Sequence, residues 1–331
     1  MEKQIKYGKY KVVLGGNMQN LILSINAVVP LFLLMMLGYS IKMFKIASKR
    51  DFDIINKLVF KIFLPILLFY NIYTTESIKT FDKSIVLFVT LGACVIFLVG
   101  YIFVKFGIKD NKKRAPMLQG FFRTNFAILG IPLINSICGE NVTGLTYLMV
   151  AIVVPMFNVL AVICFELFNT KKGNINVKSL LVGVISNPLI IGCLIGLLFF
   201  VLKIKLPFVL EKAISDVSKI ATPLAIVAIG GSFTFRSIKN CMKEVFITVS
   251  SRLVLIPVVA VTLAAMLGFR GEALACILIV FGGPVAISSF PMAQQMDCDE
   301  EIAANVVVFS SFLCIFTLFC WIFILSTLSL F

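Results

Sequence analysis

Long runs of apolar residues recur along this chain, and they constrain its fold more than any other feature. A helix needs about 20 consecutive apolar residues to cross a bilayer, and ten runs reach roughly that length. The chain of 331 residues is 60% hydrophobic with a mean hydropathy of +1.05, which is more apolar than a soluble domain of this size. We therefore predict an all-α integral membrane protein with transmembrane helices over 21–43, 55–73, 84–105, 115–137, 143–167, 179–202, 213–233, 245–268, 273–295 and 303–327.

The basic residues lie mainly in the short loops between these runs. The net charge is +14, but this placement is the positive-inside pattern of membrane proteins and not a face that binds nucleic acid. Fifteen Lys and Arg lie in loops after odd-numbered segments, whereas six lie on the opposite side when counted from Met18. We therefore predict a multi-pass protein of the cell membrane, in contact with the lipid bilayer, with both termini extracellular and loop 169–178 cytoplasmic.

The two halves of the chain repeat the same spacing of proline and glycine. In the first and sixth segments a glycine follows a proline by eight residues, and in both halves the next proline lies 35 residues after the first. These residues are Pro30, Gly38 and Pro65 in the first half and Pro188, Gly196 and Pro223 in the second. Because each half has five segments, the repeats must enter the membrane from opposite sides, as in secondary transporters with inverted repeats.

This organisation divides the chain into two repeats and an extension. We predict a first five-helix repeat over 18–168, a cytoplasmic loop over 169–178 and a second, inverted five-helix repeat over 179–331. Residues 1–17 form an N-terminal extension that lacks the apolar core of a signal peptide. Because Leu14-Gly15-Gly16-Asn17 is what a purine-rich ribosome-binding sequence encodes, we expect Met18 to be the natural start.

Two predicted segments, the fourth and the ninth, are interrupted at mid-depth by proline, glycine and polar residues. A proline removes a backbone hydrogen bond, and broken backbone survives in a membrane only beside protein or a water-filled cavity. Two interrupted segments in corresponding places of two halves indicate the binding site of a carrier. The candidate substrate-binding residues are Asn125, Phe126, Gly130, Ile131, Pro132, Pro284, Ser288, Ser289, Phe290, Pro291 and Gln294.

The chemistry of such a site favours an anion. The N-termini of half-helices present free N–H groups and a positive dipole end, which attract carboxylates. The polar side chains could bind substrate or only satisfy broken backbone, and Gln294 could lie at the membrane interface. Arg123, just before the first break, could draw anions toward the cavity. Arg252 lies about two turns inside its segment, where snorkelling and a functional or helix-anchoring role both remain open.

Other chemistries have little support in the sequence. No Asp or Glu lies near the middle of a segment, which argues against a carboxylate that carries protons. There is no histidine, and the nine cysteines form no CxxC pair, so we expect no metal site and no cofactor. Without a histidine or an acid pair at membrane depth, we also expect no enzymatic activity.

Several motifs resemble the auxin efflux carrier family, which includes plant PIN carriers and bacterial malate and malonate carriers. They are VVPLFLLMMLGYSIKMFKI, INKLVFKIFLPILLFYNI, NFAILGIPLINSICGE, ATPLAIVAIGGSF, SRLVLIPVV and PVAISSFPMAQQ, and the likeness covers Met18 to Phe331. The resemblance implies ten helices in two inverted repeats, with a scaffold domain, a transport domain, crossed broken helices four and nine, elevator-like motion and a homodimer. In plant members the ninth-helix crossover proline falls where Ser289 stands here, so the resemblance does not imply auxin as substrate.

The leading hypothesis is a secondary transporter that moves a small organic anion, a carboxylate in particular, across the cell membrane by alternating access. One alternative is a sodium-coupled organic-anion symporter that resembles bile-acid carriers, for which sodium-dependent uptake would be the distinguishing observation. Another is a membrane sensor that does not transport.

Overall fold

The computed structural model describes residues 29–30, 32–74, 83–126, 130, 133–134, 137–138, 144–168, 182–232 and 235–330. Apart from turns and one isolated bridge, these residues are helical, so the prediction of an all-α fold is confirmed for them. After a helix over Phe32–Met43, the elements are α2 (Lys49–Leu58), η1 (Val59–Phe63), α3 (Leu64–Tyr73), α4 (Lys83–Gly107), α5 (Asn111–Phe122), α7 (Gly144–Leu167), α9 (Pro188–Val201), α10 (Phe208–Ser232), α11 (Phe235–Ser250), η4 (Ser251–Leu255), α12 (Ile256–Met266), α13 (Gly271–Gly282), α14 (Ser289–Gln295) and α15 (Glu300–Thr327).

Four stretches of described helix are long and apolar enough to cross a membrane. They are α4, α10, α15 and the continuous span Cys241–Met266. Large apolar side chains on α4, among them Leu87, Leu98 and Phe106, are exposed on the outer surface of the protein. A soluble protein rarely exposes so much contiguous apolar surface, whereas lipid chains cover it at no cost. The protein therefore resides in a membrane.

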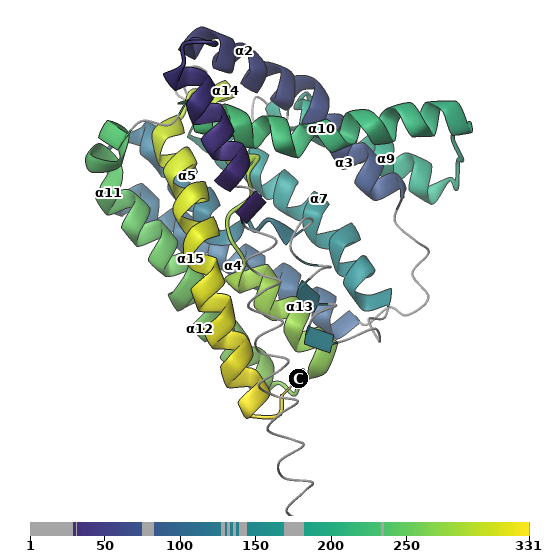
Figure 1. Ribbon diagram of the computed structural model, residues 1–331. Helices are drawn as coiled ribbons and strands as arrows, with labels where there is room; N and C mark the ends of the chain where they lie inside the picture. The colour runs from purple at the N-terminus through teal and green to yellow at the C-terminus, as the bar shows by residue number, and fades with distance from the viewer. Residues whose placement is uncertain are drawn as a thin grey trace, which may run out of the picture.

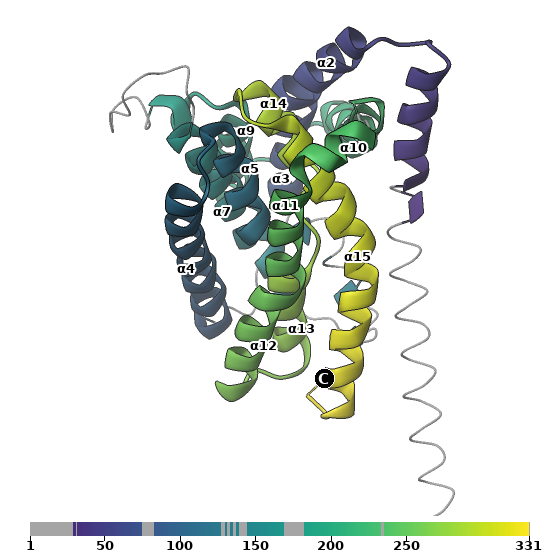
Figure 2. The same ribbon diagram turned by 90° about the vertical axis from the view of Figure 1, so that its left-hand side faces the viewer.

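The described helices pack in two groups. In the first group, α3 packs against α9 and α10, and α10 also packs against α2. In the second group, α5 packs against α4, α11 and α15, and α12 packs against α13. Figure 1 shows α2, α3, α9 and α10 together at the upper right, and Figure 2 shows α11 and α15 side by side in the other group.

Two glycines allow helices of the first group to approach closely. A Cβ atom on Gly38 would lie 2.0 Å from the carbonyl oxygen of Val227 in α10. A Cβ atom on Gly196 in α9 would lie 2.8 Å from the carbonyl oxygen of Phe69 in α3. Small residues at such contacts let the backbones pack directly, which is a common basis of helix association in membranes.

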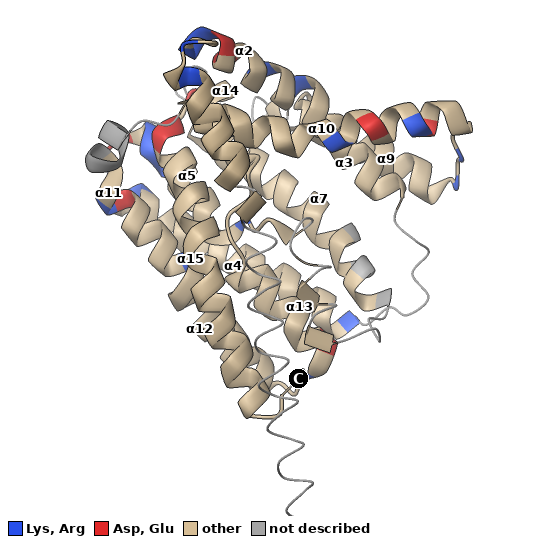
Figure 3. Ribbon diagram, in the orientation of Figure 1, with Lys and Arg blue, Asp and Glu red and all other residues tan. Residues whose placement is uncertain are grey.

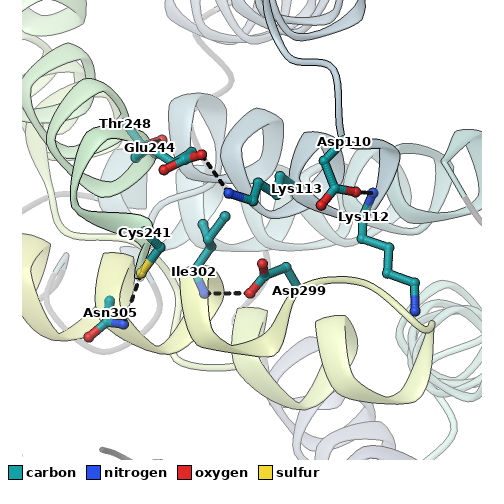
Figure 4. Close-up of polar contacts among 9 residues, drawn as sticks. All are labelled: Asp110, Lys112, Lys113, Cys241, Glu244, Thr248, Asp299, Ile302 and Asn305. Atoms are coloured by element: carbon teal, nitrogen blue, oxygen red, sulfur yellow. Dashed lines mark hydrogen bonds and ion pairs between the residues drawn. The ribbon is translucent and has the colours of Figure 1, made fainter. Parts of the chain in front are cut away.

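Charged side chains gather around α2, α14 and the first turn of α5 (Figure 3). There the start of α5 is fastened to α11 and α15 (Figure 4). Lys113 Nζ donates a hydrogen bond of 2.7 Å to Glu244 Oε1, and the Asp299 amide donates one of 3.0 Å to the carbonyl oxygen of Lys112. The Asp299 carboxylate also accepts from the Ile302 amide at 3.0 Å and thereby caps the N-terminus of α15.

Two prolines each follow a short π-helical turn within a longer helix. The turn η1 precedes Pro65, and the turn η4 precedes Pro257. A proline cannot donate the hydrogen bond to the residue four positions earlier, so the preceding backbone widens to i→i−5 bonds, as from the Ile256 amide to the Ser251 carbonyl oxygen. The wider turn of η4 contains Arg252, and this side chain points into the interior.

The two interrupted segments meet at their breaks. Helix α5 ends at Phe122, and residues 123–125 are not helical; α13 ends at Gly282, and helix resumes only with α14. Thr124 and Val285 form an antiparallel bridge, and the Asn125 amide donates a hydrogen bond of 2.9 Å to the carbonyl oxygen of Pro284. Each break therefore satisfies part of the backbone that the other one leaves open.

Candidate functional site

A cavity of about 180 Å³ lies where the two breaks face the first helix group. Its apolar wall comes from α3, α7 and α10, with Leu64, Leu68 and Phe157 as its larger members. The polar side chains are Asn71 of α3, Arg123, Thr124 and Asn125 of the first break, Asn158 of α7, Thr222 of α10 and Ser288 of the second break. Mostly apolar walls with a few convergent polar groups are typical of small-molecule sites.

Arg123 is the ionisable residue of this lining. Only 4% of Arg123 is exposed. Its Nη2 donates to Asn158 Oδ1 at 2.5 Å and to Ser288 Oγ at 2.8 Å, and its Nη1 contacts Met292 Sδ at 2.8 Å. These partners are neutral, and no carboxylate among the described residues forms an ion pair with Arg123. The guanidinium charge therefore lies at the cavity without a counter-charge from the described part of the chain.

Asn125 also faces the cavity. Its backbone amide is used in the pairing with Pro284, whereas its side-chain amide makes no hydrogen bond to any other described residue. A buried amide without a protein partner is costly unless water or a ligand satisfies it. The Asn125 side chain is thus available to a molecule in the cavity.

Arg252 is completely buried and holds the two breaks together. Its Nε donates to Gly283 O at 2.9 Å and its Nη2 to Val280 O at 2.7 Å, while its Nη1 donates to Phe121 O at 3.1 Å and to Phe122 O at 3.3 Å. These carbonyl oxygens lie at the C-terminal ends of α5 and α13, where helices leave carbonyls unsatisfied and the helix dipole is negative.

Snorkelling, which the sequence left open for Arg252, is therefore wrong, since the side chain has 0% exposure. The π-helical turn before Pro257 and the two converging helix ends turn it inward instead. The helix-anchoring role is the one that these contacts describe.

The remaining predicted residues lie around the breaks but mostly outside the cavity lining. Phe126 and Phe290 are each 1% exposed and belong to the core, and the Phe126 ring lies next to Gly130. Pro284 contributes its carbonyl to the pairing of the breaks, and Pro291 lies in the first turn of α14, where a proline is tolerated.

Two predicted polar residues are also not among the residues that line the cavity. Ser289 is buried, and its hydroxyl has no partner among the described residues. Gln294 joins α14 to α2, because its amide donates to Asp53 Oδ1 and accepts from Asn56 Nδ2, both at 2.7 Å. The predicted residues Ile131 and Pro132 lie outside the described ranges.

Four polar residues of the cavity were not among the predicted site residues: Thr124, which lies in the first break, and Asn71, Asn158 and Thr222. Each one is a polar side chain inside an apolar segment, and Asn158 and Thr222 lie close to Pro155 and Pro223. Polar residues at membrane depth are functional candidates by default, so a search restricted to the two broken segments was too narrow. Among the described residues, no group of three His, Cys, Asp or Glu side chains could hold a metal ion.

An apolar helical protein with two interrupted helices paired beside a mostly apolar cavity that contains an arginine and a few polar groups has the architecture of a membrane transporter. Comparison with known families agrees with this class. Residues 23–322 match the membrane transport protein family, and the chain belongs to this family, which is that of the auxin efflux carriers.

Two archaeal proteins resemble the chain over almost its entire length. One is an uncharacterized transporter of Methanocaldococcus jannaschii, 25% identical over 307 residues, which are 90% of this chain and 98% of that protein. The other is an uncharacterized transporter of Methanothermobacter thermautotrophicus, 19% identical over 299 residues, with 90% and 97% covered. The protein is therefore a membrane transporter.

Proposed function

We propose that this protein is a secondary transporter that moves a small organic anion, and specifically a carboxylate, across the cell membrane by alternating access. The observation that carries the proposal is Arg123, a buried guanidinium at the cavity with neutral partners only. A guanidinium is weakly hydrated and binds carboxylates in a planar, two-bonded geometry. A carboxylate in this cavity would supply the negative charge that the lining lacks.

The same charge disfavours cationic cargo. An amine in the cavity would face Arg123, and no acidic side chain is among the residues that line the described cavity. Burying an ammonium group without a partner costs several kcal/mol. Sodium coupling meets the same obstacle, because a sodium ion close to the breaks would be repelled by Arg123 and Arg252. The absence of acidic lining residues and the two nearby arginines therefore favour an anion carrier without sodium coupling over the sodium-coupled symporter.

The contacts of the first helix group support two inverted repeats. Gly38 follows Pro30 by eight residues, as Gly196 follows Pro188. Their close contacts also correspond, because Val227 and Phe69 each follow a matching proline, Pro223 or Pro65, by four residues. The antiparallel pairing of Thr124 with Val285 is what opposite insertion of the two breaks would produce.

We further propose the topology that this symmetry and the charge distribution favour. It has ten spans, and the charged region around α2 and the start of α5 faces the cytoplasm. The helix group of α2, α3, α9 and α10 would serve as the scaffold of a homodimer. The group that contains the breaks would move against it like an elevator.

A charge series of ligands tests the proposed function. Purified protein is heated with straight-chain carboxylates from propanoate to heptanoate, with α,ω-dicarboxylates of the same lengths, and with the matched amides and amines. A ligand that binds only folded protein raises the melting temperature. We expect a shift with a carboxylate but not with its amide or amine, and loss of the shift in Arg123→Gln.

The matched control is Lys219→Gln, which removes an exposed cation paired with Asp216 at 3.3 Å and should leave the ligand response unchanged. If an amine stabilises the protein more than its carboxylate does, or if no carboxylate binds, the proposed function is wrong.

A further inference from the structure

We propose that the transporter is an anion exchanger, in which the empty carrier returns across the membrane far more slowly than the loaded one. This inference rests on the proposed function and concerns its coupling. It follows from a difference between the two buried arginines in the groups that surround their guanidinium charges.

The charge of Arg252 is stabilised by the protein itself. Four carbonyl oxygens at two helix C-terminal ends surround its guanidinium, and these ends carry the negative poles of the helix dipoles. Arg252 therefore keeps these partners when the two breaks move together, because both helix ends pack against η4.

The charge of Arg123 is not stabilised in this way. Its oxygen partners are one amide and one hydroxyl, its third partner is a thioether, and its Nε has no partner among the described residues. A thioether is only a weak acceptor. Of the five N–H donors of the guanidinium, part is therefore left for an anion in the cavity.

The position of the cavity makes this difference matter for transport. Its lining comes from α3 and α10 on one side and from α7 and the two breaks on the other. Alternating access requires the two sides to close around the site during each passage. With a monocarboxylate bound, the enclosed site is neutral; when empty, it carries one uncompensated positive charge through a region of low dielectric. An uncompensated buried charge raises the barrier for the empty carrier alone.

The inference is tested with the protein in liposomes, in HEPES buffer without chloride, with the labelled monocarboxylate that gives the largest thermal shift. Uptake is measured with the same unlabelled monocarboxylate inside (exchange) and without it (net uptake). We expect exchange to be at least about tenfold faster than net uptake. A potassium diffusion potential, negative inside, should slow net uptake, because the empty site carries positive charge outward, and should leave exchange unchanged.

Two variants locate the cause in Arg123. Arg123→Gln removes the charge, so the ratio of exchange to net uptake should fall toward one even if affinity is lower. Arg123→Lys keeps the charge and should keep the high ratio, and Lys219→Gln controls for loss of a surface cation. If Arg123→Gln does not fold, or loses uptake together with its thermal shift, the dependence on membrane potential in the unaltered protein decides.

The outcomes separate the two proposals. Net uptake as fast as exchange, or a ratio unchanged in Arg123→Gln, overturns the exchange inference while carboxylate transport stands. Binding of a carboxylate without flux in either mode overturns the proposed function itself.

Discussion

Replacing Arg252 by methionine is expected to destabilise the fold strongly, although Arg252 does not line the cavity. The substitution keeps an unbranched side chain but leaves four buried carbonyl oxygens, of Gly283, Val280, Phe121 and Phe122, without their donor. Each buried group that loses its partner costs about 1–3 kcal/mol. Methionine also removes the desolvation cost of a buried charge, and this gain offsets part of the cost of the four carbonyl groups. We therefore expect the free energy of unfolding to fall by about 4 kcal/mol.

The assay is thermal unfolding in detergent, followed by retention of the monodisperse peak after heating. A loss of this size should lower the midpoint by more than about 5 °C. Arg252→Lys should lie in between, because an ammonium group has three donors and cannot reach both helix ends with a planar fork. The control is Arg270→Met, which removes an exposed arginine that donates to the carbonyls of Ala265 and Phe269. If Arg252→Met unfolds like the unaltered protein, the anchoring role of Arg252 is refuted.

Three further predictions concern the cavity, the charged region and the topology. Asn125→Ala should lower carboxylate uptake at least about tenfold and leave the melting temperature nearly unchanged, because only the backbone amide of Asn125 pairs the breaks; a variant that unfolds would favour a structural role. The hydrogen bond with Glu244 raises the pKa of Lys113 above its usual value. A raised Lys pKa contributes stability that is fully present below the usual value and is lost as the pH rises through the pKa of the folded protein, so the melting temperatures of the unaltered protein and of Lys113→Met with Glu244→Gln should converge at high pH. A cysteine introduced into loop 169–178 should react with an impermeant reagent only from the cytoplasm, and labelling from outside alone would reverse the proposed orientation.

The fold class and the place of the breaks could be predicted from sequence because both depend on local patterns. Apolar runs of bilayer length predict membrane helices whatever their neighbours are. The segments around Asn125 and Pro284 combine glycine, proline and polar residues, and each of these weakens a helix in lipid. The structure places both residues in the paired breaks, where the sequence predicts the helices to be interrupted.

The partners of the breaks could not be predicted, because they come from distant parts of the chain. Asn158 is 35 residues from Arg123, and Arg252 is 131 residues from Phe121. By position alone, Arg252 could reach the interface, but the turn before Pro257 and the carbonyl oxygens of the two helix ends direct it inward. Gln294 follows the cavity residue Ser288 by six positions, but α14 places it against α2, where it forms hydrogen bonds with Asn56 and Asp53.

The two buried arginines have different partners, and we therefore assign them different roles. Breaking two helices at one place creates unsatisfied carbonyls with negative helix ends, and a buried cation is the donor that satisfies several of them at once. Arg252 fills this role through four carbonyl oxygens. Arg123 is therefore not needed to hold the breaks, and its guanidinium stays at the cavity among neutral partners. A charged side chain at membrane depth is costly and usually functional, which agrees with the anion cargo that we propose. Under the proposed function, a carboxylate would complete the pair each time it binds.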